Sequence, residues 1–272
     1  MSNLSYMQKA TDRGQLQIHV TTERGFFPIK DASIRLSYTG NPTEIIEELS
    51  TDISGQTAAV ELPAPPLEYS MEPSEFQPYS EYTIQVNASG YRPINISGIS
   101  VLPDKTSIQN VRMETATVEN PLERNIVITA NTLYGNFPPK IPEDEIKPMT
   151  ESGEIVLSRV VIPEYVIVHD GPPSDSSAND YYVRYRDYIK NVASSEIYAT
   201  WPDAALRANI LAIMSFTLNR VYTEWYRNKG YDFTITSSTA FDHKFVYGRN
   251  IFSNISNIVD EMFNSYLSRP NV

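Results

Sequence analysis

The chain has no cysteine, no long apolar run and no excess of basic residues. The absence of Cys excludes disulfides and thiolate metal sites. No stretch reaches the ~18 consecutive apolar residues that a membrane-spanning helix needs, so we expect no membrane span. A net charge of −11 at pH 7 provides no basic stripe to meet phosphates, which argues against a nucleic-acid partner.

What the chain does contain is enough apolar and aromatic material for real hydrophobic cores. Hydrophobic residues make up 41% of its 272 residues, with 18 Tyr and 10 Phe, which excludes a disordered protein and gives room for two domains. Residues 1–10 lack the apolar core of a signal peptide, so we expect no conventional signal peptide.

The N-terminal third predicts a β-sandwich over residues 12–114. Apolar and polar residues alternate in three segments, which is typical of strands with one buried face. Turn-forming residues at 52–56 and 89–93 lie between strands. This order of strands and turns resembles the carboxypeptidase regulatory-like, or prealbumin-like, sandwich domains. The alternating residues are Leu16, Ile18 and Val20; Ala32, Ile34, Leu36 and Tyr38; and Tyr82, Ile84, Val86 and Ala88.

Residues 115–154 predict an exposed linker or pro-segment. The range is rich in proline and contains the acidic run Glu143-Asp144-Glu145, with little apolar periodicity. Exposed backbone of this kind is where proteases cut. An ordered strap across the second domain is the alternative, because Leu133, Tyr134 and Phe137 could dock.

Residues 155–272 predict an α+β domain with two long amphipathic helices. The first is expected over Pro202–Lys229 with Gly230 as its cap, and the second over 251–267. The whole chain is therefore expected to be an α+β multidomain protein. The apolar faces are Leu206, Ile210, Ile213, Met214, Leu218, Val221, Tyr222 and Trp225 in the first helix, and Ile251, Ile255, Ile258, Val259, Met262, Phe263, Tyr266 and Leu267 in the second.

Glu196 is the candidate catalytic residue. It lies between small polar residues and the aromatic residues Tyr198 and Trp201, and we expect it in a loop braced by the helix that follows. A carboxyl in an aromatic, partly dry setting has its charged form disfavoured, so its pKa should rise toward that of a working general acid. The alternative is that Glu196 only caps a backbone N–H, and spacing alone favours that alternative.

Three runs of sequence carry a resemblance to a known family. They are residues 186–198, 215–226 and 234–240. The segment around Glu196, with Trp201-Pro202 after it, is similar to the signature of the stage II sporulation protein D family (the SpoIID/LytB domain). More closely, residues 154–272 resemble the clostridial spore cortex-lytic enzymes of the SleC type.

The resemblance implies a function for Glu196 and an architecture for the chain. In that family the matched Glu is the acid/base of a peptidoglycan lytic transglycosylase, which cleaves between muramic acid and glucosamine without water. The family's N-terminal region is a pro-segment that a serine protease removes during germination. The resemblance thus implies a spore cortex-lytic zymogen made in the mother cell, located in the cortex or coat region and activated by a germination-specific protease. Because the family's catalytic domain continues further, we expect residues 155–272 to be its N-terminal part, truncated at the C-terminal end.

Four further residues are candidates for contact with a glycan substrate. Tyr185, Tyr198 and Trp201 could present aromatic faces to sugar C–H surfaces, although burial in the core is the alternative for such rings. His243 lies in a polar loop and is a candidate groove residue. We expect no cofactor and no metal, because His169 and His243 share no ligand spacing.

Two other functions stay open at this point. A non-catalytic SpoIID-like module could bind glycan strands or activate a partner amidase without cutting. A structural spore protein could use the sandwich for assembly. Aromatic residues near Glu196 suit the first of these as well as they suit an enzyme.

Overall fold

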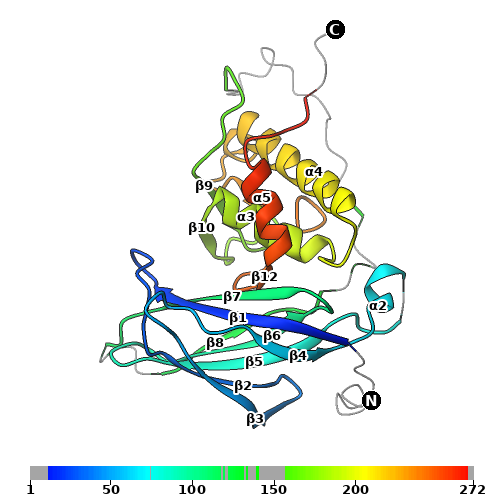
Figure 1. The fold of residues 1–272 in the computed structure, drawn as a ribbon. Helices are drawn as coiled ribbons and strands as arrows, with labels where there is room; N and C mark the ends of the chain where they lie inside the picture. Colours follow the sequence, from blue (N-terminus) through cyan, green and yellow to red (C-terminus); the bar gives the residue numbers. More distant parts are fainter. Residues whose placement is uncertain are drawn as a thin grey trace. The chain divides into compact units, whose positions relative to one another are not determined.

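The computed structural model describes residues 12–73, 75–117, 119, 122–131, 133, 139–140 and 157–268. It is an α+β protein whose chain divides into two compact units (Figure 1). The first unit is Met1–Tyr134 with Tyr198–Trp201 and Tyr247–Asn254, and the second is Gly135–Ile197, Pro202–Val246 and Ile255–Val272.

Two sheets form the first unit. One has the order β12-β7-β1-β4 and the other the order β3-β2-β5-β6-β8. Their strands, with the short helix α2, are β1 (Asp12–Thr22), β2 (Ser33–Tyr38), β3 (Asn41–Ser50), β4 (Val60–Ala64), α2 (Glu68–Met71), β5 (Ser80–Asn87), β6 (Ile94–Val101), β7 (Thr106–Met113), β8 (Arg124–Val127) and β12 (Ile251–Phe252). The predicted β-sandwich-like fold of the N-terminal part is confirmed.

The core of this unit follows the alternation in the sequence. The apolar set on one face of β1, β2 and β5 is completely buried, and the residues between them are more exposed. The turn at 52–56 is also formed as predicted: the Asp52 Oδ1 atom accepts hydrogen bonds from the N–H groups of Ser54 (2.8 Å) and Gln56 (3.1 Å). Gly55 has φ +74° there, and a Cβ atom would lie 2.5 Å from the Val20 oxygen, so only glycine fits. The fully buried set is Leu16, Ile18, Val20, Ile34, Leu36, Tyr82, Ile84 and Val86.

A segment from near the end of the chain completes one sheet of the first unit. Strand β12 pairs antiparallel with β7, with Ile251 opposite Ile108. The Asn250 side chain makes two hydrogen bonds with the backbone of Ser100, each 3.0 Å long. Burial lowers the pKa of Arg249 to about 10, and its guanidinium donates to the Thr129 oxygen at 2.7 Å. The sandwich therefore includes β8 and β12, which lie beyond the predicted range 12–114.

The second unit has a three-stranded sheet of order β10-β9-β11 and three helices. Helices α3 and α4 pack against each other. Along the chain, β9 is followed by a loop and then by β10, and β10 continues directly into α3. The elements are β9 (Tyr165–His169), β10 (Asp180–Arg184), α3 (Tyr185–Glu196), α4 (Asp203–Tyr222), the 3₁₀ turn η1 (Arg227–Lys229), β11 (Ile235–Thr236) and α5 (Ser253–Met262), of which Ile255–Met262 belongs to this unit.

The long helix is shorter than the sequence predicts. Helix α4 begins at Asp203, so Pro202 is the residue before the helix. It ends at Tyr222, whereas the predicted helix runs to Lys229. Glu224 has φ +47°, which no helix interior allows, so the helix cannot continue through it. Gly230 does adopt the left-handed conformation of a cap, with φ +85°, but it closes the 3₁₀ turn.

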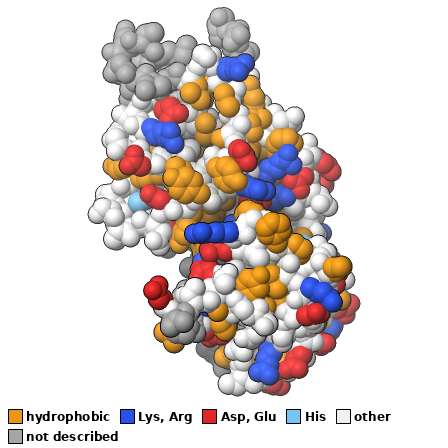
Figure 2. Space-filling view, turned by 90° about the vertical axis from the view of Figure 1, so that its left-hand side faces the viewer, with side chains coloured by type: hydrophobic (Ala, Val, Ile, Leu, Met, Phe, Trp, Pro, Cys, Tyr) orange, Lys and Arg blue, Asp and Glu red, His pale blue; other side chains and the backbone are white. Residues whose placement is uncertain are grey.

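Several expectations fall on parts of the chain that the structure does not describe. Residues 141–156, with the acidic run Glu143-Asp144-Glu145, lie outside the described ranges, as do Tyr134 and Phe137. The boundaries at 114 and 155 stay predictions. Within the described ranges, no helix has both the length and the apolar character needed to cross a membrane. Figure 2 shows acidic and basic side chains interspersed among hydrophobic ones on the face in view, without a basic stripe there.

Candidate functional site

Glu196 is the last residue of helix α3 and does not lie in a loop as expected. The N–H of Ile197 still donates to the Ala193 oxygen at 3.1 Å, so the helical hydrogen-bond ladder extends past Glu196. The helix is anchored by a buried face that includes Tyr185, Tyr188, Ile189 and Val192. The carboxyl is therefore held on a rigid element, at the end of a helix where the dipole disfavours negative charge.

The two carboxyl oxygens of Glu196 differ in their hydrogen bonding. Oε1 accepts a hydrogen bond of 2.7 Å from the Lys244 N–H, while Oε2 has no hydrogen-bond partner among the described residues. Burial raises the pKa of Glu196, and the Lys244 N–H and the charges of Lys140 and Lys244 offset part of that rise. The direction of the shift agrees with the expectation. The hydrogen bond from the Lys244 N–H also fits the alternative interpretation, in which Glu196 only caps a backbone N–H.

The N–H that binds Glu196 belongs to a short segment, 242–246, that is held at both ends. At one end, the Asn191 side chain donates to the Val246 oxygen at 2.8 Å and accepts from the Val246 N–H at 3.0 Å. At the other end, Asp242 is fixed by a buried cluster of donors. Because Asn191 and Glu196 lie on the same helix, the helix and the segment together determine where the Lys244 N–H points. We call residues 242–246 the clamped segment.

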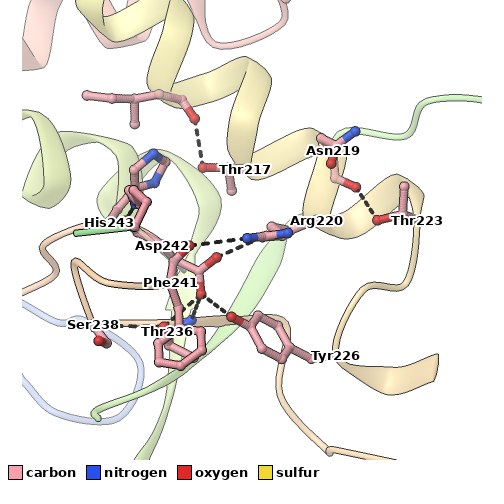
Figure 3. A network of polar contacts seen from close by, with 12 residues as sticks. Thr217, Asn219, Arg220, Thr223, Tyr226, Thr236, Ser238, Phe241, Asp242 and His243 are labelled. Carbon is pink, nitrogen blue, oxygen red and sulfur yellow. Dashed lines mark hydrogen bonds and ion pairs between the residues drawn. The ribbon is translucent and has the colours of Figure 1, made fainter. Parts of the chain in front are cut away.

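Asp242 is the centre of a buried polar network (Figure 3). Its Oδ1 atom accepts from Arg220 Nε at 2.7 Å, and its Oδ2 atom accepts from the Tyr226 hydroxyl at 2.6 Å. Oδ2 also accepts from the N–H and the hydroxyl of Thr236, at 2.9 and 2.7 Å. A second guanidinium nitrogen of Arg220 donates to the Phe241 oxygen at 3.2 Å. Both oxygens of Asp242 are therefore committed to protein donors.

Arg220 is the functional residue that sequence reasoning missed. Its side chain is 3% exposed, and its guanidinium carbon lies 4.6 Å from the ring centres of both Phe216 and Trp225. The signal was present in the sequence, because Arg220 follows Ile213 and Thr217 on the inward face of α4. A buried Arg needs an acidic partner, but the sequence does not say which of several carboxylates supplies it.

Lys140 lies within the predicted linker but belongs to the second unit. Its ammonium group donates to the backbone oxygen of Asp242 and lies 5.6 Å from the centre of the Phe216 ring. Its positive charge is one of the influences that lower the pKa of Glu196.

His243 belongs to the clamped segment and does not act as an acid or base near neutral pH. It is 8% exposed, and its Nδ1 atom lies 3.3 Å from the Tyr188 hydroxyl. Burial lowers the pKa of His243 to about 3, so the ring is neutral near pH 7. The structure therefore places His243 next to Lys244 in the clamped segment, as a side chain packed against Tyr188 and Phe216.

Two of the three aromatic candidates, Tyr185 and Tyr198, do not offer an open ring face to a sugar. Tyr185 and Tyr198 are each 2% exposed, so neither presents a ring face to solvent. Tyr198 and Trp201 belong to the first unit, where the Trp201 indole donates to the Ser70 oxygen at 2.9 Å. The alternative given for these rings, packing in the core, describes Tyr185 and Tyr198.

No metal site is visible among the residues that the structure describes, where no group of three or more His, Asp or Glu side chains converges. His169 instead pairs with Asp180, whose Oδ1 atom lies 2.8 Å from the ring Nδ1, and its ring stacks on Phe233.

The raised pKa of Glu196 makes stability depend on pH in a defined direction. The folded state holds this proton more tightly than the unfolded chain, so ionising Glu196 costs stability once the pH exceeds its ordinary pKa of 4.5. We expect Glu196→Gln to unfold at a higher temperature than the wild type at neutral pH, and at nearly the same temperature near about pH 4. Thermal unfolding of both proteins across this range measures the difference. If Glu196→Gln raised the unfolding temperature by the same amount at every pH, the result would contradict the raised pKa of Glu196.

Comparison with known proteins identifies one family in a range that lies mostly in the second unit. Residues 178–261 match the family model described as "SpoIID: Stage II sporulation protein". No curated protein matches the chain. The matched range contains Glu196, Arg220 and the clamped segment.

Similar solved structures resemble only part of the chain. The TIE protein of Bacillus anthracis is 17% identical, with a TM-score of 0.27 over 39% of this chain and 17% of its own. The minor pilin GBS52 of Streptococcus agalactiae is 13% identical, with a TM-score of 0.27 over 39% of this chain and 46% of its own. The 5-hydroxyisourate hydrolase of Klebsiella pneumoniae is 16% identical, with a TM-score of 0.24 over 37% and 86%. The chain thus spans less than half the length of the first two, and the family match identifies a SpoIID-type domain at residues 178–261.

Proposed function

We propose that the chain is a sporulation-related peptidoglycan lytic transglycosylase in which Glu196 is the single acid/base. The SpoIID match supports a role in sporulation at peptidoglycan. The observation that carries the catalytic proposal is the carboxyl group of Glu196. It is half-buried, its pKa is raised, and one of its oxygens is fixed by the Lys244 N–H while the other has no hydrogen-bond partner in the described part of the chain.

One carboxyl group can perform both proton transfers of this reaction. In the first step Oε2 donates its proton to the glycosidic oxygen as the bond from that oxygen to the anomeric carbon of muramic acid breaks. In the second step the resulting carboxylate takes the proton of the C6 hydroxyl of the same sugar, whose oxygen bonds to the anomeric carbon and closes an anhydro ring. No water is consumed, and Glu196 ends in the protonated state in which it began.

The surroundings of Asp242 favour this mechanism over hydrolysis. A hydrolytic glycosidase uses two carboxyl groups, one as acid and one as nucleophile or base. Asp242 is a buried carboxylate of the second unit, and Arg220, Tyr226 and Thr236 occupy both of its oxygens. A carboxylate held by protein donors in this way has no lone pair directed at a substrate. Asp242 therefore serves to hold the clamped segment.

The proposal extends to a zymogen of the spore cortex. We propose that the N-terminal strands of the sandwich form a pro-segment, that a germination-specific serine protease cuts within residues 115–154, and that the cleaved protein degrades cortex glycan. The proline-rich composition of residues 115–154 supports a cleavable connection.

Limited proteolysis tests this organisation. We expect a broad-specificity protease to cut first within residues 115–154, because strands and helices with bonded backbones resist cleavage. Mass spectrometry of the first fragments locates the cut. Early cleavage inside β1 or α4 would show that the cleavable connection is misplaced.

The decisive assay for the catalytic proposal is digestion of purified spore cortex peptidoglycan. We expect the wild-type protein to release soluble muropeptides once it has been cleaved within residues 115–154, and to release few before cleavage. Glycan binding without release of any fragment by either form would favour the second function, a SpoIID-like module that binds strands or activates an amidase.

A further inference from the structure

A cavity of about 150 Å³ in the second unit has no role in the mechanism above. It lies at the end of helix α4 and beside strand β9, and Glu196 is not among the residues that line it. An apolar cavity of roughly this size holds a molecule as large as benzene. The cavity therefore suits one small substituent of a ligand and is too small for a whole sugar residue. The lining residues used below are Tyr165, Glu224, Trp225, Tyr226, Arg227 and Phe233.

Aromatic rings form a rigid wall of this cavity. Trp225, Tyr226 and Phe233 make a buried cluster, and the rings of Tyr226 and Phe233 lie 4.8 Å apart. Tyr165 differs from them because it is 43% exposed at the start of β9. A ligand could thus place an apolar group against the buried rings while a larger ring lies on Tyr165, as aromatic faces pack well against apolar surfaces.

The lining of the cavity also offers one acceptor and one donor. Glu224 and Arg227 are oppositely charged, but Glu224 Oε2 and Arg227 Nε are 3.7 Å apart, which is too long for a hydrogen bond. Their side chains are 22% and 56% exposed. Both can therefore turn to a ligand without losing a close hydrogen bond to each other.

The backbone at Glu224 is strained. Its φ of +47° is a conformation that glycine adopts more easily, so the carboxylate is present at a cost to the local backbone. Strain of this kind is common where a side chain is needed at a binding site.

We propose that this cavity binds the acetamido group of an N-acetylhexosamine. The methyl group would contact the aromatic wall, the amide N–H would donate to Glu224, and the amide oxygen would accept from Arg227. The pyranose ring would lie against Tyr165. The inference rests on the proposed function, because the sugars of a peptidoglycan strand carry acetamido groups, and it adds a strand-binding site whose lining does not include Glu196.

Binding to soluble oligosaccharides tests the proposal on the full chain. The Glu196→Gln variant is used throughout so that no probe can be cleaved. Tetra-N-acetylchitotetraose is titrated in parallel with cellotetraose, which has the same linkage and ring shape but no acetamido groups. We expect calorimetry to detect the first probe and not the second. Equal binding of both probes would overturn the proposal.

Four further substitutions locate the site. Tyr165→Ala should weaken the affinity by about tenfold, the size expected for one aromatic contact, while Tyr165→Phe should keep it. Glu224→Gly should weaken binding while the backbone keeps its conformation, because glycine adopts this positive φ without strain. Tyr266→Ala removes a tyrosine of equal exposure, 43%, and should change nothing. Unchanged affinity in both Tyr165→Ala and Glu224→Gly would overturn the proposal.

The outcome is separable from that of the catalytic proposal. If the wild-type protein releases no fragments from cortex glycan either before or after cleavage, but the four variants behave as expected, the lytic function fails and the acetamido site stands. If cleavage occurs while the two probes bind alike, the site fails and the lytic function stands.

Discussion

Glu196→Gln is expected to reduce cleavage of cortex glycan by about 10²–10⁴-fold, the usual contribution of general acid–base catalysis. The amide keeps the size of the side chain, and its oxygen can still accept the hydrogen bond from the Lys244 N–H. It cannot donate a proton to the glycosidic oxygen or remove one from the C6 hydroxyl. Helix α3 and the clamped segment should therefore stay in place while both proton transfers fail. Release of muropeptides measures the loss, and circular dichroism confirms the fold.

A second glutamine substitution serves as the control for this result. Glu164 lies in the same unit but is exposed at the start of β9. Glu164→Gln should leave the rate unchanged. If Glu196→Gln retained wild-type activity, or if both variants lost activity equally, Glu196 would not be the acid/base.

Asp242→Asn is expected to give the largest loss of stability, about 3–5 kcal/mol of unfolding free energy, which is typical of breaking a buried ion pair from one side. The substitution leaves the guanidinium of Arg220 buried without its counter-charge. Tyr226 and Thr236 both donate hydrogen bonds to Asp242 Oδ2. An NH₂ group at that position cannot accept them, so these hydrogen bonds are lost as well. Denaturant unfolding of the second unit measures the loss.

The chain contains a matched control for this prediction. On the same helix, Arg207 Nε lies 2.7 Å from Asp203 Oδ2, the same separation as in the buried pair, but the side chains are 38% and 68% exposed. Exposed pairs contribute about 0–1 kcal/mol, so Asp203→Asn should change stability very little. Similar losses in the two variants would show that burial does not govern the Asp242 pair.

The sequence predicted the sandwich well because its strands bury only one face. A period-two pattern such as Leu16, Ile18 and Val20 has one interpretation, and the structure buries all three side chains completely. Strand β12 could not be predicted in this way. It has two residues, Ile251 and Phe252, which also fit the start of the helical pattern that follows, and only pairing with β7 makes them a strand.

Helix α3 shows why the site was predicted only in part. Tyr185, Tyr188, Ile189 and Val192 recur every three or four positions, which is the pattern of a buried helical face. The sequence predicts the start of a helix at Pro202, so Glu196 is expected in a loop before it, whereas the structure makes Glu196 the last residue of α3. Its role as candidate acid/base came from resemblance, whereas its raised pKa could be expected from its apolar neighbours.

The clamped segment lies beyond what sequence patterns can predict. Asn191 contacts Val246, and Glu196 contacts Lys244, at separations of 55 and 48 residues along the chain. No local periodicity links residues so far apart. A buried arginine on the inward face of α4 signals that an acidic partner exists, but only the fold shows that Asp242 supplies it.

The most direct test of the central claim is digestion of cortex glycan in oxygen-18-labelled water, with mass spectrometry of the products. A single carboxyl group that activates the C6 hydroxyl of muramic acid produces anhydro-muramic ends and incorporates no label. Hydrolysis would instead place one labelled oxygen at each new reducing end. The account predicts unlabelled anhydro ends that disappear with Glu196→Gln, and labelled reducing ends would contradict it.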